Sequence, residues 1–163
     1  MLPEALTTAA MALLDACKQR GVIITTAESC TGGLIAGCLT EIAGSSAVVD
    51  RGFVTYSNAA KAEMLGVPMA MIDARGAVSK EVAMTMAIGA LAKSNAQLSI
   101  AVTGVAGPGG GSPEKPVGLV HFGCAMTNRP TVHERHVFKG GRSDVRRETV
   151  RTALRIMADR LVD

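Results

Sequence analysis

Apolar residues recur every three to four positions over several stretches of the chain, which is the period of an amphipathic helix. In residues 3–20, for example, Leu6, Ala10 and Leu13 fall on one face of the predicted helix. The pattern predicts five helices, over residues 3–20, 34–44, 58–65, 80–93 and 143–162.

Shorter apolar runs, rich in β-branched residues and bounded by glycine, proline or asparagine, predict strands. They cover residues 22–26, 52–56, 97–103, 117–126 and 131–138. The third run lacks clean alternation, as expected of a strand that is buried on both faces. The last two runs are joined across Asn128 and Pro130, which predicts a hairpin. Helices that alternate with strands indicate an α/β layered domain, with a mostly parallel sheet and one antiparallel edge.

Polar residues and glycine end or follow three of the predicted strands. Ser29 follows the first strand, Tyr56 and Ser57 lie at the end of the second, and Thr103 and Gly104 at the end of the third. Ligands of α/β sheets bind where the carboxyl ends of strands meet the amino termini of helices. We therefore expect the chemistry of the protein at this edge of the sheet.

Composition narrows the class of protein. A chain of 163 residues predicts one domain, residues 1–163. Hydrophobic residues make up 48 % but aromatic residues only 2 %, so we expect small-residue helices packed closely on the sheet. The shortage of aromatic rings argues against a single-strand nucleic-acid binder. The formal charge of +3 is too small to imply a nucleic-acid partner.

The cysteines and the apolar runs indicate the cellular compartment of the protein. Four cysteines show neither a CxxC motif nor metal-ligand spacing, which is typical of small buried residues in a reducing compartment. We find no signal peptide and no apolar run long enough to span a bilayer. We therefore expect a cytoplasmic protein without a membrane partner. Helix faces rich in alanine and methionine leave a homodimer open.

The segment from Thr25 to Gly33 carries the first candidate chemistry. It places Ser29 on a turn between a strand and a helix, with Thr31, Gly32 and Gly33 expected in the first helical turn. Free N–H groups at a helix start favour an anion, so amides there suit an oxyanion or a phosphate. The alternative is that Ser29 or Thr31 only caps the helix.

Lys61 lies in or just past the first turn of the helix that Ser57 is expected to cap. A lysine there opposes the helix dipole. It is either a solvated side chain or a general base with a lowered pKa. Lowering the pKa of a lysine to near neutrality requires about 4 kcal/mol of free energy, which is more than the helix dipole supplies. Lys61 can therefore act as a base only if it is largely buried and lies close to a hydroxyl. Tyr56 either hydrogen-bonds one of these groups or packs at the rim.

The segment from Gly104 to Pro116 is a glycine-rich loop after a strand. It lacks the ending of a phosphate-binding P-loop and a clean dinucleotide fingerprint. It is either a mobile connector or a backbone cradle for a ligand, and Thr103 at the strand end is placed to donate or accept a hydrogen bond in the site.

The basic residues near the end of the chain divide into two groups. Arg147, Arg151 and Arg155 share one helix face, which is expected to be solvated or at an interface. Arg142 precedes the predicted helix and is a candidate to bind a phosphate with its planar guanidinium.

The histidines and carboxylates give no sign of a metal site. His133 and His136 are expected on opposite faces of a strand, and His121 is expected to be isolated. We find no His/carboxylate cluster or Asp/Glu pair that suggests a metal.

Five segments together resemble the CinA C-terminal family in order and spacing: AESCTGG, YSNAAK, GAVSKEVAMTMA, TGVAGPGGG with the following KPVG, and GGRSDVRRETV. The resemblance extends from about Leu6 to Leu161. The family includes stand-alone bacterial nicotinamide-nucleotide amidohydrolases. Resemblance to it implies a three-layer α/β/α fold, with deamidation of nicotinamide mononucleotide to nicotinate mononucleotide and ammonia.

The resemblance also implies a serine–lysine mechanism without metal or other cofactor. Ser29 would be the nucleophile and Lys61 its general base, with Tyr56 and Thr103 assisting. The amides near Thr31, Gly32 and Gly33, and those near Gly104, would hold an oxyanion or ligand atoms. The expected partner is a small-molecule nucleotide.

Two other classes of function remain open. One is a nucleotide-binding module that keeps the pocket without the chemistry. The other is an interaction protein in competence or DNA-damage response. The enzyme is favoured because a hydroxyl, a lysine and glycine turns all map to one end of the sheet.

Overall fold

The computed structural model describes residues 2–162. The helices are α1 (Glu4–Arg20), α2 (Leu34–Thr40), α3 (Asn58–Leu65), α4 (Met69–Arg75), α5 (Lys80–Ala92) and α6 (Arg142–Val162), with a 3₁₀ turn η1 (Ser45–Ala47). The strands are β1 (Ile24–Glu28), β2 (Val49–Val54), β3 (Leu98–Gly104), β4 (Leu119–Met126) and β5 (Val132–Val137).

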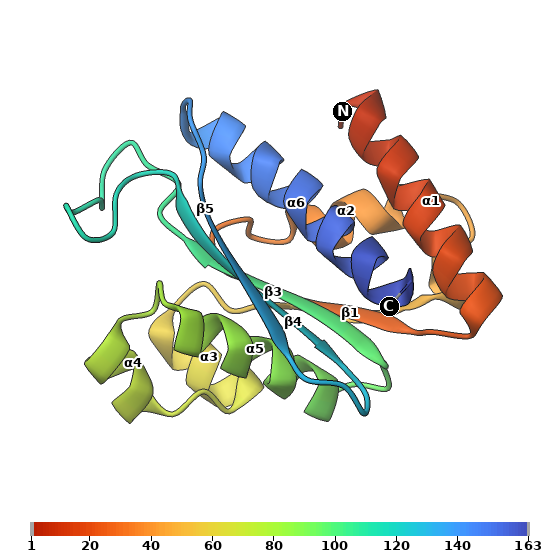
Figure 1. Cartoon of the computed structure of the whole chain (residues 1–163), viewed down its shortest axis with the longest axis horizontal. Helices are drawn as coiled ribbons and strands as arrows, with labels where there is room; N and C mark the ends of the chain where they lie inside the picture. Colours follow the sequence, from red (N-terminus) through yellow and green to blue (C-terminus); the bar gives the residue numbers. More distant parts are fainter. Residues whose placement is uncertain (1, 163) are drawn as a thin grey trace.

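A sheet of five strands separates two layers of helices (Figure 1). Helices α1, α2 and α6 cover one face of the sheet, and α3, α4 and α5 cover the other. The strand order is β2-β1-β3-β4-β5. The predicted three-layer α/β/α fold is therefore confirmed.

The direction of the strands refines the prediction of a mostly parallel sheet. Strand β1 pairs in parallel with β2 on one side and with β3 on the other. Strand β4 runs antiparallel to β3, and β5 runs antiparallel to β4. The antiparallel β4–β5 hairpin forms one edge of the sheet, as predicted, and within it β4 alone runs against the direction of the other strands.

Several predicted boundaries also shift. Strand β1 runs to Glu28 instead of ending at residue 26, and β2 covers Val49–Val54 instead of residues 52–56. Helix α4 was not predicted, because it is only seven residues long and lies between Pro68 and Gly76, two residues that signal a break. The predicted hairpin between β4 and β5 is confirmed.

Small residues allow the helices to approach the sheet closely. All five residues of β1 are buried, as are the first six of β3, which fits their central position. At Gly123 on β4, an added Cβ atom would collide with the backbone carbonyl of Ala83 on α5. This close approach confirms the prediction of small-residue packing and leaves the aromatic side chains few places in the core.

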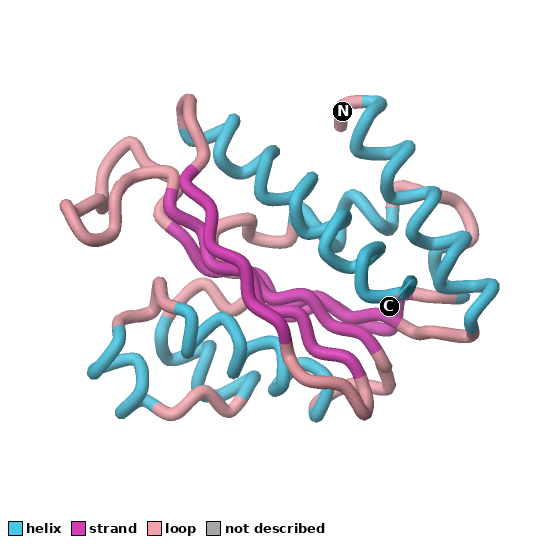
Figure 2. The backbone as a smooth tube through the Cα atoms, in the orientation of Figure 1, coloured by secondary structure: helices cyan, strands magenta, loops and turns pink. Residues whose placement is uncertain are grey.

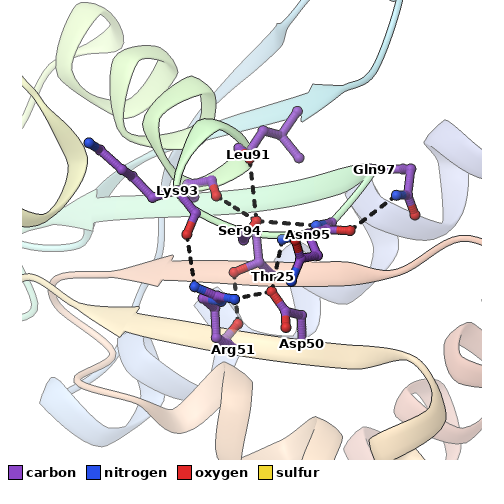
Figure 3. Close-up of polar contacts among 10 residues, drawn as sticks. Thr25, Asp50, Arg51, Leu91, Lys93, Ser94, Asn95 and Gln97 are labelled. Atoms are coloured by element: carbon purple, nitrogen blue, oxygen red, sulfur yellow. Dashed lines mark hydrogen bonds and ion pairs between the residues drawn. The ribbon is translucent and has the colours of Figure 1, made fainter.

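The amino-terminal ends of the parallel strands are tied together by polar contacts (Figure 3). Arg51 donates to the carbonyl oxygen of Lys93 at 3.0 Å, and Asp50 accepts from the backbone N–H of Asn95 at 2.9 Å. Thr25 on β1 donates to the carbonyl oxygen of Arg51 at 2.7 Å. The connection from α5 to β3 is therefore fixed to β2, which helps to set the relative position of the strands.

The opposite, carboxyl-terminal ends of the parallel strands carry the residues expected to be functional. Ser29 follows β1, Tyr56 lies two residues beyond β2, and Gly104 ends β3. The glycine-rich segment between β3 and β4 continues from this end as a loop that projects past the sheet (Figure 2). The predicted convergence on one edge is confirmed. Among the described residues, no helix has the length and hydropathy to cross a bilayer.

The histidines are arranged differently from the prediction. His121 on β4 is not isolated, because its Nδ1 lies 2.8 Å from Nε2 of His133 on the neighbouring strand β5. Burial lowers the pKa of His121 to about 4. His136 stacks on Phe138 and contacts Glu134 instead. In residues 2–162, no group of three or more His, Cys, Asp or Glu side chains is placed to hold a metal ion.

Candidate active site

Ser29 is the first residue after β1, and its backbone is fixed on both sides. Its N–H donates to the carbonyl oxygen of Val102 at 3.1 Å, which extends the contact between β1 and β3 by one residue. Its own carbonyl accepts from Gly32 N–H at 3.0 Å, which closes a tight turn. The residue is only 8 % exposed. The hydroxyl therefore stands on a rigid strand end and not on a mobile loop.

The turn after Ser29 differs from the prediction. Helix α2 begins at Leu34, so Thr31, Gly32 and Gly33 precede it and do not form its first turn. Gly32 has φ 58° and Gly33 has φ 105°, in the left-handed region that glycine enters without steric cost. The two glycines reverse the chain between β1 and α2, which a continuous helix could not do.

The amino terminus of α2 is already occupied by the carboxylate of Glu28. Its Oε1 accepts from the N–H of Ile35 at 2.8 Å, and its Oε2 from the N–H of Ala36 at 3.0 Å. The expectation of free amides for an anion at this helix end is therefore wrong. Sequence reasoning missed Glu28, although an acidic residue that ends an apolar strand just before a helix is a signal for such a contact.

Lys61 reaches Ser29 from the neighbouring strand connection. Its Nζ lies 3.0 Å from Ser29 Oγ, 2.8 Å from the carbonyl oxygen of Thr55 and 3.3 Å from that of Tyr56. The lysine is 1 % exposed, although it lies on a short surface helix. The predicted cap is present: Ser57 Oγ accepts from the N–H of Ala60 at 3.0 Å. The geometry thus meets both conditions set for a lysine base, burial and contact with a hydroxyl.

Burial is the main cause of the pKa shift of Lys61. Removal from water disfavours the ammonium form and lowers the pKa of Lys61 from its ordinary value of 10.5. Among the described residues, no carboxylate lies within ion-pairing distance of its Nζ. The neighbouring thiol of Cys30 responds in the opposite direction, because burial raises its pKa to about 12. The thiol therefore keeps its proton at neutral pH, and the amine loses its proton more easily than it would in water.

Ser29 and Lys61 open onto a cavity of about 330 Å³. Its walls come from four further parts of the chain besides the Ser29 turn: residues 56–61, residues 77–78, residues 103–110 and Arg142. Of the predicted binding residues, Gly104 and Arg142 line it, whereas Thr31, Gly32 and Gly33 are not among the described residues that do. Their proposed contact with ligand atoms is therefore not supported by this geometry.

Tyr56 and Thr103 line the cavity without touching the serine or the lysine through their side chains. The Tyr56 ring is 62 % exposed, and its hydroxyl lies 3.3 Å from Nη2 of Arg142. Thr103 donates its hydroxyl hydrogen to the carbonyl oxygen of Ala77 at 2.9 Å. Tyr56 contacts Lys61 through its backbone carbonyl, so the expected hydrogen bond from its phenol is not seen.

The arginines of α6 have separate places. Arg142 is the first residue of the helix and donates to the carbonyl oxygen of Gly107 at 2.8 Å. Arg146, which was not singled out from sequence, donates to the carbonyl oxygens of Cys30 and Thr31, each at 3.1 Å. Arg147, Arg151 and Arg155 are exposed, as predicted for a solvated face, and form ion pairs on the surface.

Comparison with known proteins gives consistent matches over nearly the whole chain. The family model of the CinA C-terminal domain matches residues 6–161. The nicotinamide-nucleotide amidohydrolase PncC of Escherichia coli (strain K12) is 50 % identical over 143 residues, which cover 88 % of this chain and 87 % of that protein. The protein of the same name from Enterobacter agglomerans is 51 % identical over 144 residues, covering 86 % and 88 %.

Solved structures show the same fold. The competence/damage inducible protein CihA from Agrobacterium tumefaciens superposes with a TM-score of 0.97 at 51 % identity, over 100 % of this chain and 99 % of that one. The competence damage-inducible protein A (ComA) from Klebsiella pneumoniae superposes with a TM-score of 0.92 at 36 % identity, over 96 % and 97 %.

The buried lysine predicts a pH-dependent stability. Between the lowered pKa of Lys61 and 10.5, the unfolded chain holds a proton that the folded chain has released, so the free energy of unfolding should rise with pH. One proton allows a slope of at most about 1.4 kcal/mol per pH unit. Lys61→Met should flatten this rise, as measured by urea unfolding from pH 7 to 10.

The exposed Lys139 offers the matched control, because Lys139→Met removes an ammonium that is already in water. This variant should keep the slope of the parent protein. An unchanged slope in the Lys61 variant would show that the amine is charged in the folded state.

Proposed function

Since the chain belongs to the CinA C-terminal domain family, we propose that it hydrolyses the carboxamide of nicotinamide mononucleotide to nicotinate mononucleotide and ammonia, with Ser29 as nucleophile and Lys61 as general base. The relatives that carry the amidohydrolase name match over most of both chains, which supports the reaction. The observation that carries the mechanism is the 3.0 Å contact between Lys61 Nζ and Ser29 Oγ inside the fold.

The surroundings of Nζ suit an uncharged amine. A neutral lysine has two N–H donors and one lone pair. The two donors match the carbonyl oxygens of Thr55 and Tyr56, and the lone pair then faces the hydroxyl of Ser29. The structure has Nζ donating to Ser29 Oγ; once the amine has lost one proton, this hydrogen bond reverses and the serine donates to the lone pair, which is the contact that a general base needs before proton transfer.

Ser29 is preferred over its neighbour Cys30 as the nucleophile. Both residues line the cavity, and a thiol is the better nucleophile once it is deprotonated. However, burial raises the pKa of Cys30 to about 12, so its thiolate is scarce at neutral pH. The lysine hydrogen-bonds to the serine oxygen, which gives that hydroxyl a direct route to lose its proton.

The reaction follows from these positions in two halves. Ser29 Oγ attacks the carboxamide carbon while its proton passes to Lys61, and a tetrahedral intermediate forms. The ammonium of Lys61 returns the proton to the leaving nitrogen, the C–N bond breaks, and ammonia departs from an acyl-enzyme. A water molecule then loses a proton to Lys61 and adds to the ester carbon. The bond from this carbon to Ser29 Oγ breaks, the proton on Lys61 passes to Oγ, and the nicotinate product leaves.

Backbone amides at the cavity wall are assigned to the oxyanion. The N–H groups of Ser29 and Val105 already donate to the carbonyls of Val102 and Leu119, so the candidates are Cys30 on one side of the cavity and Ala106 and Gly107 on the other. Gly104 leaves little room for a side chain there, because an added Cβ would press on the carbonyl of Leu119. Amides fixed in this way stabilise developing negative charge without reorganisation.

Arg142 is assigned to the phosphate of the substrate. Its guanidinium lines the same cavity as Ser29 and is held by the carbonyl of Gly107 and the hydroxyl of Tyr56. Among the described residues, no carboxylate pairs with it, so its charge is available for a ligand. A planar guanidinium binds phosphate oxygens through paired N–H donors.

The nucleophile is tested by Ser29→Ala. Because the alcohol forms the covalent bond in this scheme, the variant should lose about 10³-fold or more of kcat. Ammonia release from nicotinamide mononucleotide measures it, and calorimetry measures binding, which should persist. Cys30→Ala, at the residue that follows Ser29, is the matched control and should retain turnover within about tenfold.

Each contrary result points to a different alternative. Normal turnover by Ser29→Ala would exclude the serine mechanism. Binding of the nucleotide by the wild-type protein without ammonia release would indicate a binding module in place of an enzyme.

The phosphate contact is tested by Arg142→Gln. Loss of the guanidinium should raise KM for the mononucleotide by about 10- to 100-fold, since a charge-assisted contact contributes roughly 1.5–3 kcal/mol, while kcat changes little. Kinetics with nicotinamide riboside, which has no phosphate, should be unaffected. Arg147→Gln, on the exposed face of the same helix, is the control, and an equal effect of Arg142→Gln on both substrates would contradict the assignment.

A further inference from the structure

Glu28 is a buried carboxylate that the mechanism above does not use. It precedes Ser29 directly in the chain and is 1 % exposed. It accepts four hydrogen bonds: from the hydroxyl of Thr31 at 2.6 Å, the N–H of Ile35 at 2.8 Å, the N–H of Ala36 at 3.0 Å and the hydroxyl of Thr26 at 3.3 Å. These donors come from β1, from the turn and from α2, so one side chain joins three consecutive parts of the structure.

The hydrogen bonds to Glu28 leave its carboxylate no free acceptor position for a substrate. A carboxylate offers about four acceptor positions, and all four are occupied by protein donors. Glu28 is also not among the described residues that line the cavity. Any influence on the reaction must therefore pass through the residues that it holds.

The backbone of Glu28 reaches the other half of the dyad. Its carbonyl oxygen accepts from the N–H of Thr55 at 2.9 Å, and the carbonyl of Thr55 in turn accepts from Nζ of Lys61 at 2.8 Å. Glu28 is thus one peptide bond from Ser29 and two hydrogen bonds from Lys61. A shift of this residue would alter both partners at once.

The turn that carries Ser29 needs support from outside, because glycine loses more conformational freedom on folding than any other residue. Glu28 holds the inner side of the turn through the hydroxyl of Thr31. Arg146 holds another part through the carbonyl oxygens of Cys30 and Thr31. Thr31 is therefore fixed by its side chain to Glu28 and by its backbone to Arg146.

We infer that Glu28 is a positioning residue that sets the separation of Ser29 and Lys61 by clamping Thr31 and the start of α2. This inference rests on the proposed function, because the dyad is what the clamp serves. It also gives Thr31 a role that differs from the predicted substrate contact: its hydroxyl faces Glu28 and holds the turn.

Thr31→Val provides the sharpest test, because valine keeps the shape and removes only the hydroxyl. A displacement of reacting atoms by about 1 Å can cost on the order of 100-fold in rate. We expect kcat for ammonia release to fall by about 10- to 100-fold while KM changes less than about threefold. Thr31→Ser restores the hydroxyl and should recover most of kcat, which a mere loss of stability would not produce.

Two further variants serve as a control and as a second test of the same contact. Thr40→Val makes the same change at the far end of α2, where the hydroxyl only bonds carbonyls of its own helix, and should retain wild-type kinetics. Glu28→Gln places an amide against the N–H donors of α2 and should lower kcat at least as much as Thr31→Val. All assays are run well below each variant's unfolding midpoint, measured in parallel.

A second readout separates this inference from the proposed substrate. The rate at which a fluorophosphonate probe labels Ser29, followed by mass spectrometry, reports serine reactivity without any substrate. Slower labelling and turnover in Thr31→Val, restored in Thr31→Ser, support the clamp. If Thr31→Val keeps wild-type kcat and labelling, the positioning role of Glu28 is overturned and the proposed function is not. A wild-type protein that neither labels at Ser29 nor releases ammonia overturns the proposed function and the clamp together.

Discussion

The hydrogen bond between Lys61 Nζ and Ser29 Oγ is the contact on which the rest of this site depends. It joins residues that are 32 positions apart in the chain, and it forms only because β1 and β2 are parallel neighbours whose carboxyl ends lie side by side. Burial of an amine is unfavourable unless the amine is neutral and its hydrogens have acceptors. The sheet supplies these acceptors as two carbonyl oxygens just beyond β2.

The surrounding structure can be understood as support for this contact. Glu28 and Arg146 fix the turn on the serine side, and the cap at Ser57 fixes the start of the helix on the lysine side. A buried lysine costs stability because its ammonium form loses hydration, and costs of this kind are typical of functional sites. The apolar packing of β1 and β3 between two helix layers offsets that cost.

Much of this arrangement could be predicted from sequence, because it depends on local patterns. Apolar runs located the strands, the residues at their ends gave the serine and the edge of the sheet, and the helix capped by Ser57 gave the lysine. The parts that were missed depend on tertiary contacts. The partners of Glu28 come from a turn whose left-handed glycines no apolar period reveals. The pairing of His121 with His133 depends on the register of β4 and β5, and α4 is too short to give a periodic signal.

The central claim is that burial lowers the pKa of Lys61, so that its amine releases a proton more readily than the amine of an exposed lysine. Nuclear magnetic resonance of protein carrying ¹³C-labelled lysine follows the Cε signal of each lysine through its own titration, with Lys61→Met used to assign the signal. The account predicts that the Lys61 signal titrates at a lower pH than the signals of the exposed lysines. A Lys61 signal that titrates together with those of the exposed lysines would contradict it.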